Sequence, residues 1–372
     1  MKIALLSMDY PPRMAGGTTI HTYQLAKAMH TLGHEVHVVA ASHPEAPRHE
    51  VKEGINIHRV KRPYSIFSAY RTKSLLNDLD IIHGHGICSY GHLMINKFPT
   101  VVKMHNTWLG EFERYKKVSG NVTRKMDSAT MMRLYVRMDR TCCKKADHLI
   151  CISDVIKNET KKYGITETKM TVIHNGIDYA RFDVKENYRD NLNLKGLVVG
   201  YIGRLEPHKG VEFIIKAAKN IHAQFLLVGG GSDEGRLKGL VQKLGLEKKI
   251  KFTGYLPYDE IPKYYASVDV VVYPTLYEPL GNVVLEAMAA GKPIIASNVD
   301  GIPEIFEEGT GYMLAPSELE HQLAEKLKIL LGDDKLRKKM GAKGKELVKG
   351  HSWVEVARET VKVCESVLEY SE

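Results

Sequence analysis

Two glutamates eight positions apart are the residues of this chain best suited to chemistry. Glu278 lies in a loop with Pro279 and Gly281, and Glu286 follows inside an apolar segment that ends at Gly291. Proline and glycine before such a segment indicate the start of a helix, and a glycine after it indicates the end. Eight helical residues span about 12 Å, so the two carboxylates could hold hydroxyl groups at opposite ends of one ligand.

The start of this expected helix is suited to bind a phosphate. Backbone N–H groups near Gly281 and Asn282 face back toward Glu278, and the positive end of the helix dipole favours an anion there. Glu286 is the only charged residue between Val283 and the end of the segment, so we expect a buried helix. A buried carboxylate needs partners, which come either from the protein or from the hydroxyls of a ligand. The alternatives are a solvated loop carboxylate at 278 and a structural hydrogen bond at 286.

A second loop carries two cations after the apolar run 197–202. Arg204 and Lys209 lie in a turn that contains Gly203, Pro207 and Gly210. Arginine offers a two-pronged donor and lysine a point charge, so the pair suits one diphosphate. Most surface bases are merely solvated, but their place after an expected strand favours an anion site.

Three further features are weaker signals. Gly16 and Gly17 follow the first strand-like run and open a helical segment, so the backbone could approach a phosphate or sugar closely there. His105 ends another strand-like run, where a single histidine is more often structural. Asp78 and Asp80 form a D-x-D, a pattern that can hold a divalent metal ion. This one precedes an expected strand instead of following it, which disfavours a metal site. The histidines show no spacing typical of a metal site, so we expect no bound metal.

Strand-like runs alternate with segments of helical period, which indicates parallel sheets covered by helices. The runs are 2–7, 35–40, 55–59, 80–85, 100–105 and 148–152, then 197–202, 224–228, 250–252, 268–273 and 293–297. The charged stretch 178–194 lacks apolar periodicity and separates the two groups. We predict an α/β protein of two doubly wound lobes, 1–185 and 186–352, with a C-terminal helix over 353–372 that returns to the first lobe. Ligands bind beyond the carboxyl ends of such strands, so we expect the site in a cleft between the lobes.

The composition excludes several classes of protein. The chain has 372 residues, of which 44% are apolar and 26% charged. No apolar run reaches the roughly 20 residues that a membrane span needs, and the N-terminal run is too short for a secretory signal. The five cysteines include no CxxC pair, which favours reduced thiols and a cytoplasmic location.

The positive charge is confined to the first half of the chain. Residues 1–180 hold 26 lysines and arginines against 16 acids, whereas the second half is nearly neutral. The segment 113–145 carries ten bases and three acids. It is either a solvated helix face or a surface for an anionic lipid or a phosphorylated acceptor, because each clustered base adds on the order of 1 kcal/mol near an anionic membrane.

In order and spacing, these motifs resemble glycosyltransferase family 4, retaining enzymes of the GT-B fold. The E-x₇-E pattern that continues as EAMAAGKPI carries the resemblance most strongly. Further segments match the family's loops and strand ends, namely 10–17, 80–85, 103–107, 173–178 and 203–210. Together they cover roughly residues 3 to 300.

The resemblance implies retaining, metal-independent transfer of a hexose from a UDP- or GDP-sugar to a hydroxyl, with the nucleotide in the second lobe and the acceptor in the first. Glu286 would hold the ribose, Glu278 the sugar hydroxyls, and His105 would orient the sugar or its acceptor. The expected catalytic residues are Glu278, His105, Arg204 and Lys209. The expected donor-binding residues are Gly16, Gly17, Arg204, Lys209, Glu278, Leu280, Gly281, Asn282, Val283 and Glu286.

The expected partners are a nucleotide sugar, a sugar or lipid-linked acceptor and an anionic membrane surface, with no cofactor and no nucleic acid. Two other functions stay open. A nucleotide-sugar epimerase can share the two-lobed fold, and a non-catalytic relative could bind sugar nucleotide alone. A dehydrogenase is disfavoured because the chain lacks GxGxxG with a downstream acid.

Overall fold

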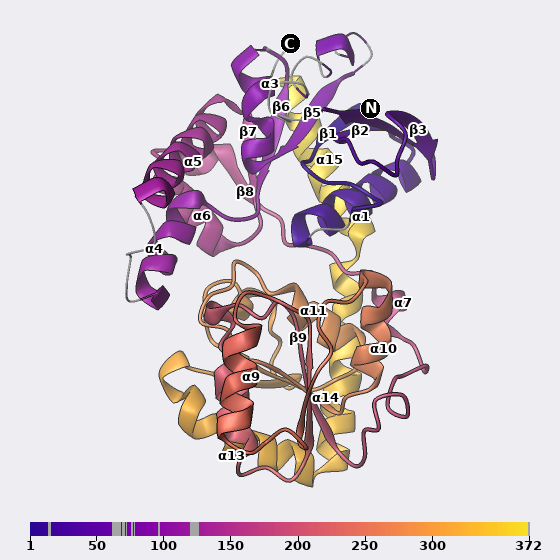
Figure 1. Cartoon of the computed structure of the whole chain (residues 1–372). Helices are drawn as coiled ribbons and strands as arrows, with labels where there is room; N and C mark the ends of the chain where they lie inside the picture. The colour runs from indigo at the N-terminus through magenta and orange to yellow at the C-terminus, as the bar shows by residue number, and fades with distance from the viewer. Residues whose placement is uncertain are drawn as a thin grey trace. The chain divides into compact units, whose positions relative to one another are not determined.

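The computed structural model divides the chain into two compact units (Figure 1). Unit 1 comprises Met1–Gly176 and Trp353–Glu372, and unit 2 comprises Ile177–Ser352. The structure describes the whole chain except residues 14, 15, 62–67, 69, 70, 72, 76, 78, 96, 120–125, 371 and 372, and the side chains of 114–119 and 126–130.

Unit 1 contains an eight-stranded sheet in the order β3-β4-β2-β1-β5-β6-β7-β8. All neighbouring strands are parallel except β3, which is antiparallel to β4. The strands are β1 (Lys2–Leu6), β2 (Glu35–Ala41), β3 (His49–Lys52), β4 (Ile55–Val60), β5 (Ile81–His85), β6 (Thr100–Met104), β7 (His148–Cys151) and β8 (Met170–Val172).

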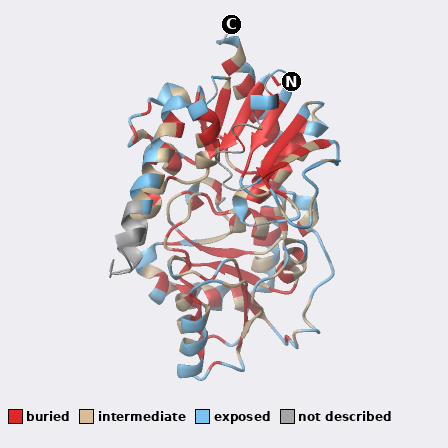
Figure 2. Cartoon of the chain, turned by 45° about the horizontal axis from the view of Figure 1, so that its top comes forward, coloured by how far each residue is buried: buried red, intermediate tan, exposed pale blue. Residues whose placement is uncertain are grey.

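Helices cover both faces of this sheet, which explains why its central strands β2, β1, β5 and β6 are almost wholly buried (Figure 2). The helices are α1 (Gly17–Thr31), α3 (Tyr90–Ile95), α4 (Trp108–Ser119), α5 (Met126–Lys145), α6 (Asp154–Lys161) and α15 (Trp353–Glu369). On one face, Ile3 and Leu5 pack with Leu25 of α1 and Ala357 of α15. As predicted, the C-terminal helix therefore returns to the first unit.

Unit 2 contains a six-stranded, wholly parallel sheet in the order β11-β10-β9-β12-β13-β14. Its strands are β9 (Val198–Ile202), β10 (Gln224–Val228), β11 (Ile250–Phe252), β12 (Val270–Tyr273), β13 (Ile294–Ser297) and β14 (Gly311–Leu314). Its helices are α7 (Tyr179–Phe182), α8 (Val211–Ala218), α9 (Glu234–Lys243), α10 (Ile261–Ala266), α11 (Asn282–Ala289), α12 (Ile302–Ile305), α13 (Leu319–Gly332) and α14 (Asp334–Leu347).

The division between the units lies earlier than the predicted boundary after residue 185. Unit 2 begins at Ile177 because α7 packs against α10 and α11. The guanidinium of Arg181 in α7 lies 4.3 Å from the ring centre of Tyr258 and also pairs with Asp259. The charged stretch after α7 thus belongs to unit 2, although it lacks apolar periodicity.

The predicted α/β class, with two doubly wound parallel sheets, is confirmed. In each sheet the strand order reverses once, between β1 and β5 in unit 1 and between β9 and β12 in unit 2. Such reversals separate the loops that follow adjacent strands and leave room for a ligand at the carboxyl edge. Among the helices that the structure describes, none combines the length and apolarity needed to cross a membrane.

Candidate functional site

Lys209 and Glu278 form a buried ion pair at the switch point of unit 2. The Lys209 Nζ lies 2.7 Å from Glu278 Oε2, and the two side chains are 9% and 15% exposed. Lys209 Nζ also lies 3.1 Å from the hydroxyl of Tyr273, which donates a hydrogen bond to the same carboxylate oxygen. Because β9 and β12 are parallel neighbours, the loops after them bring these residues together.

The charges around this pair fix its protonation. Burial by itself raises the pKa of Glu278, but Lys209, Tyr273 and His208 outweigh it and hold that pKa below its ordinary value. Burial, with Lys209 and Arg204 nearby, lowers the pKa of His208 to about 4. At neutral pH the carboxylate is therefore ionised and the imidazole is neutral. The side chain of Arg204, in contrast, is exposed.

A second loop, which contains Asp300 and Gly301, makes two hydrogen bonds to the backbone of Glu278. The Glu278 N–H donates to Asp300 Oδ2 at 3.0 Å, and the Gly301 N–H donates to the Glu278 carbonyl at 3.1 Å. A Cβ atom on Gly301 would lie 2.1 Å from the carbonyl oxygen of Pro279, so only glycine allows this close approach. Sequence reasoning missed Asp300. The Asp-Gly dipeptide, a common turn signal, was the available clue.

The start of α11 has the character expected of an anion site. Gly281 precedes the helix with a left-handed φ of 100° and, as a glycine, has no side chain with which to cap it. The first turn of the helix itself holds no acidic residue, which favours an anion at the positive end of the dipole. Leu280 and Gly281 are buried, whereas Asn282 and Val283 are partly exposed. Glu278 contacts this start, since a Cβ on Gly281 would lie 3.4 Å from Glu278 Cγ.

Glu286 lies about one turn into α11, which begins at Asn282. Its Oε2 accepts a hydrogen bond of 2.8 Å from the hydroxyl of Tyr265, so the protein itself supplies the donor that a buried carboxylate requires. Burial raises the pKa of Glu286 to about 7, although Tyr265 and Arg181 act in the opposite direction. No sequence motif indicates Tyr265, which lies in α10.

The remaining predicted residues, Gly16, Gly17 and His105, belong to unit 1. Gly16 precedes α1 with a left-handed φ of 85°, and the first turn of α1, which begins at Gly17, carries no acid. His105 follows β6 and is partly exposed. Its Nε2 lies 3.0 Å from Nδ1 of His85, and burial holds the pKa of His105 well below its ordinary value.

The D-x-D pattern at 78–80 forms no metal site among the described residues. Asp78 lies outside the described residues, and Asp80 Oδ2 accepts a hydrogen bond of 2.7 Å from the backbone N–H of Lys2. Asp80 therefore joins the ends of β1 and β5. The structure does bring together three imidazoles, those of His21, His85 and His105, although their spacing in the sequence is not typical of a metal site.

Comparison with known proteins decides the family. Residues 15–181 match the model of "Glycosyltransferase Family 4", and residues 184–347 match that of "Glycosyl transferases group 1". An uncharacterized glycosyltransferase of Methanocaldococcus jannaschii is 31% identical to the chain over 99% of both sequences. The chain belongs to glycosyltransferase family 4.

Solved structures agree with the fold of this family 4 glycosyltransferase. Sucrose-phosphate synthase from Thermosynechococcus elongatus superimposes with a TM-score of 0.80 at 23% identity, over 99% of both chains. Anabaena HepE in complex with UDP-glucose superimposes with a TM-score of 0.79 at 21% identity, over 98% of this chain and all of the other. Both are GT-B glycosyltransferases, so the GT-B fold expected from the sequence is confirmed.

The raised pKa of Glu286 leads to a prediction about the stability of this glycosyltransferase. A carboxyl that ionises near pH 7 when folded but near its ordinary value when unfolded stabilises the fold only at low pH, and that contribution is lost as pH rises through about 7. Glu286→Gln keeps the acceptor for Tyr265 and removes the charge. We expect it to raise the free energy of unfolding by about 1–3 kcal/mol above pH 7, and to have little effect near pH 4.5. Urea denaturation at several pH values measures this, with the exposed Glu247→Gln as control.

Proposed function

We propose that this glycosyltransferase moves a hexose from a nucleotide-diphosphate sugar, UDP- or GDP-linked, to a hydroxyl group, with retention of configuration. The observation that carries the proposal is the Lys209–Glu278–Tyr273 cluster beside the start of α11. A cation and a helix start suit a diphosphate, and a carboxylate suits sugar hydroxyls. The similarity to a protein solved with UDP-glucose supports a nucleotide-sugar donor.

In this proposal the protein positions the donor and stabilises charge. A lysine ammonium has three N–H donors. Glu278 and Tyr273 take two of those of Lys209, which leaves the third for a phosphate oxygen. Arg204 provides a second cation, and Glu286 accepts from the ribose hydroxyls. The leaving diphosphate takes the proton of the acceptor as the old bond at the sugar carbon breaks and the new one forms, so no protein nucleophile and no metal is required.

Two measurements test the donor and the reaction. In a thermal-shift screen of nucleotide diphosphates and their sugars, a ligand at about 100 times its dissociation constant stabilises by about 2.7 kcal/mol. The best donor is then incubated with and without candidate acceptors, and NMR reads the anomeric configuration of the product. An inverted product would contradict retention. An epimer formed without acceptor would support the epimerase alternative, and binding without any turnover would support a non-catalytic relative.

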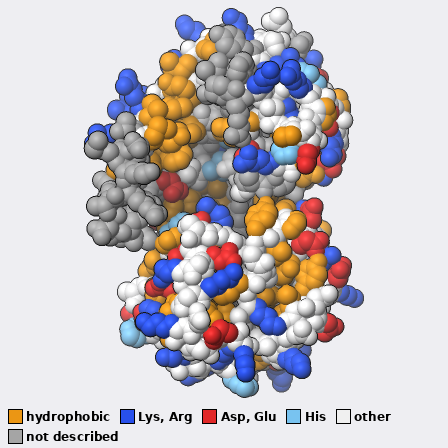
Figure 3. All heavy atoms as spheres, in the orientation of Figure 1, with side chains coloured by type: hydrophobic (Ala, Val, Ile, Leu, Met, Phe, Trp, Pro, Cys, Tyr) orange, Lys and Arg blue, Asp and Glu red, His pale blue; other side chains and the backbone are white. Residues whose placement is uncertain are grey.

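We further propose that unit 1 receives the acceptor and that its basic surface contacts an anionic membrane at the cytoplasmic face. Among the described residues of α5, Arg133, Arg137 and Arg140 are exposed at helical spacing. Met131 and Leu134 are exposed on the same helix, 46% and 48%. Figure 3 shows hydrophobic side chains gathered over this side of unit 1 with basic ones beside them. The predicted bases Arg114, Lys116, Lys117, Arg124 and Lys125 lie outside the described side chains.

Vesicle co-sedimentation tests the membrane contact. We expect binding to anionic vesicles at low salt that weakens as salt screens the charges. Arg133→Glu with Arg137→Glu should weaken it by at least roughly tenfold, because each base near the surface contributes about 1 kcal/mol. The matched control reverses two exposed lysines of unit 2, Lys238 and Lys243. Equal binding to neutral and anionic vesicles, or equal losses in both double variants, would rule the surface out.

A further inference from the structure

A column of buried polar side chains lies on one face of the unit 1 sheet. His83 and His85 of β5 project to the same face as Lys103 of β6, because side chains alternate along a strand and β5 pairs with β6 in the register His85–Lys103. His105 follows Lys103 at the same two-residue spacing. This is the face that α1 and α15 cover, since Ile81 and Val101, one step earlier in each strand, pack with those helices.

His21 of α1 reaches into this column. Its ring centre lies 4.7 Å from that of His105 and 5.1 Å from that of His85, and Trp353 of α15 packs on it at 5.3 Å. His21 is completely buried. Neither ring nitrogen of His21 has a hydrogen-bond partner among the described residues.

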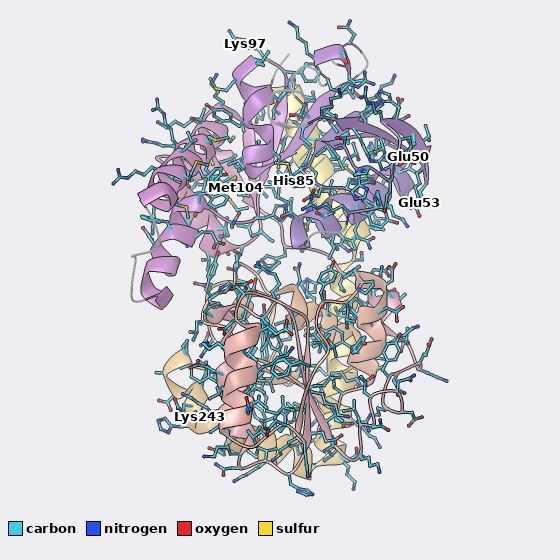
Figure 4. All side chains as sticks on the ribbon, in the orientation of Figure 1. Glu50, Glu53, His85, Lys97, Met104 and Lys243 are labelled. Atoms are coloured by element: carbon cyan, nitrogen blue, oxygen red, sulfur yellow. The ribbon has the colours of Figure 1, made fainter. Side chains whose placement is uncertain are left out.

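Such unpartnered nitrogens need an explanation. Burying a polar group without a hydrogen bond costs free energy, and a native protein that carries several at one place commonly holds a water or an ion there. His85 lies at the carboxyl end of β5 (Figure 4), which is one of the two strands at the switch point of unit 1. This is the edge at which open parallel sheets bind ligands.

We propose that His21, His85 and His105 bind one divalent transition-metal ion, of which Zn²⁺ is the best match. The three residues offer ligand nitrogens that all lie within 4.8 Å of one another, the one such group of three among the described residues. Zn–N bonds of about 2.0–2.1 Å place tetrahedral ligands roughly 3.3 Å apart. His85 Nδ1 and His105 Nε2, a hydrogen-bonded pair 3.0 Å apart, lie near this separation, and because all the ligand nitrogens lie within 4.8 Å of one another, binding has to draw them together by at most roughly 1.5 Å.

The protonation of the cluster fits a metal ion. Burial holds the pKa values of His21, His85 and His105 well below the ordinary value, so all three are neutral at pH 7, the form that binds metal. Lys103 is the nearby cation whose charge would repel a metal ion. Burial lowers the pKa of Lys103 to about 7, and its Nζ donates to the carbonyl oxygen of Ile173 at 3.0 Å, so its repulsion of the ion is reduced.

Three histidines leave one position of a tetrahedral ion for water or an anion, as in open zinc sites. His105 is the partly exposed member, which gives the ion a path from solvent. A bound ion would hold the imidazole of His105 away from a sugar or acceptor, so Zn²⁺ should slow transfer. This consequence for activity rests on the proposed function, whereas the binding of the metal does not.

Titration of the full-length protein with Co²⁺ and Zn²⁺ tests the site. After dialysis against a chelator, we expect one Co²⁺ per chain, with the intense visible bands of a tetrahedral ion, and its displacement by Zn²⁺. His105→Asn and His21→Asn should each weaken Zn²⁺ binding by at least roughly 100-fold, more than the loss of an outer-shell partner. These measurements do not depend on turnover, so they separate this proposal from the proposed function.

The matched control is His37→Asn, which disrupts another histidine pair of unit 1, 3.0 Å apart at the His37 and His58 nitrogens. It should leave the tetrahedral Co²⁺ spectrum intact. Far-UV circular dichroism checks the fold of each variant, and the partly exposed His105 supplies a test if His21→Asn does not fold. Octahedral Co²⁺ bands only, or equal Zn²⁺ affinity in the wild type and His105→Asn, would mean that the imidazoles merely pack as neutral rings and would overturn the proposal.

Discussion

Replacing Lys209 with alanine is expected to lower kcat/KM by at least roughly 10²-fold, the scale of losing one charge-stabilising group at an active site. Lys209 is the buried cation of the proposed donor site, and its ammonium holds Glu278 and Tyr273 together. The substitution removes the donor for the diphosphate and leaves a buried carboxylate without its cation. Steady-state transfer assays with the donor identified by thermal shift measure the loss.

Lys216→Ala is the matched control for this experiment. Lys216 also pairs with a carboxylate, that of Glu320 at 3.2 Å, but both side chains are well exposed, so the pair contributes little and turnover should be unchanged. Because removing one partner of a buried ion pair costs about 3–5 kcal/mol, melting curves must show that Lys209→Ala is folded at the assay temperature. Near-normal turnover in a folded Lys209→Ala protein would remove Lys209 from the site.

The sequence predicted most strands because parallel strands are buried on both faces and appear as continuous apolar runs. The run 197–202 became β9, whose five residues are all buried. The strands that it missed lack this signal. β3 has only exposed or half-buried residues, β8 is three residues long, and β14 begins with a glycine and is mostly half-buried or exposed.

The candidate site was predicted one motif at a time, and what escaped prediction is how the motifs meet. Lys209 and Glu278 are 69 positions apart, so the sequence assigned each to a ligand and could not show that they bond to each other. The supporting residues Tyr273 and Asp300 are ordinary in sequence and become significant only through the fold. The imidazoles of His21, His85 and His105 come from α1, β5 and the end of β6. No short sequence motif can indicate that residues so far apart in the chain lie close together.

Glu278→Gln is the second substitution for which we expect at least a roughly 10²-fold loss of kcat/KM. The amide keeps the size of the side chain but not its charge, so it binds both the Lys209 ammonium and the sugar hydroxyls more weakly.

The same substitution should change how the stability of the fold depends on pH. The pKa of Glu278 lies below its ordinary value, so the ionised carboxylate stabilises the fold above the unfolded pKa, and this contribution is lost as pH falls through the folded pKa. Acid denaturation of Glu278→Gln should therefore begin from a lower stability and depend less on pH. The exposed Glu247→Gln serves as control.

Combining Glu278→Gln with Lys209→Ala distinguishes a shared role from two separate ones. Residues that contact different parts of a ligand lose activity independently, so the double variant would fall by the product of the two losses, roughly 10⁴-fold. Residues that act as a unit lose little more together than apart. The 2.7 Å bond between these side chains and their common contact with Tyr273 favour the unit. We therefore expect the double variant to lose clearly less than the product, and full multiplicativity would show that the ion pair does not persist when the donor is bound.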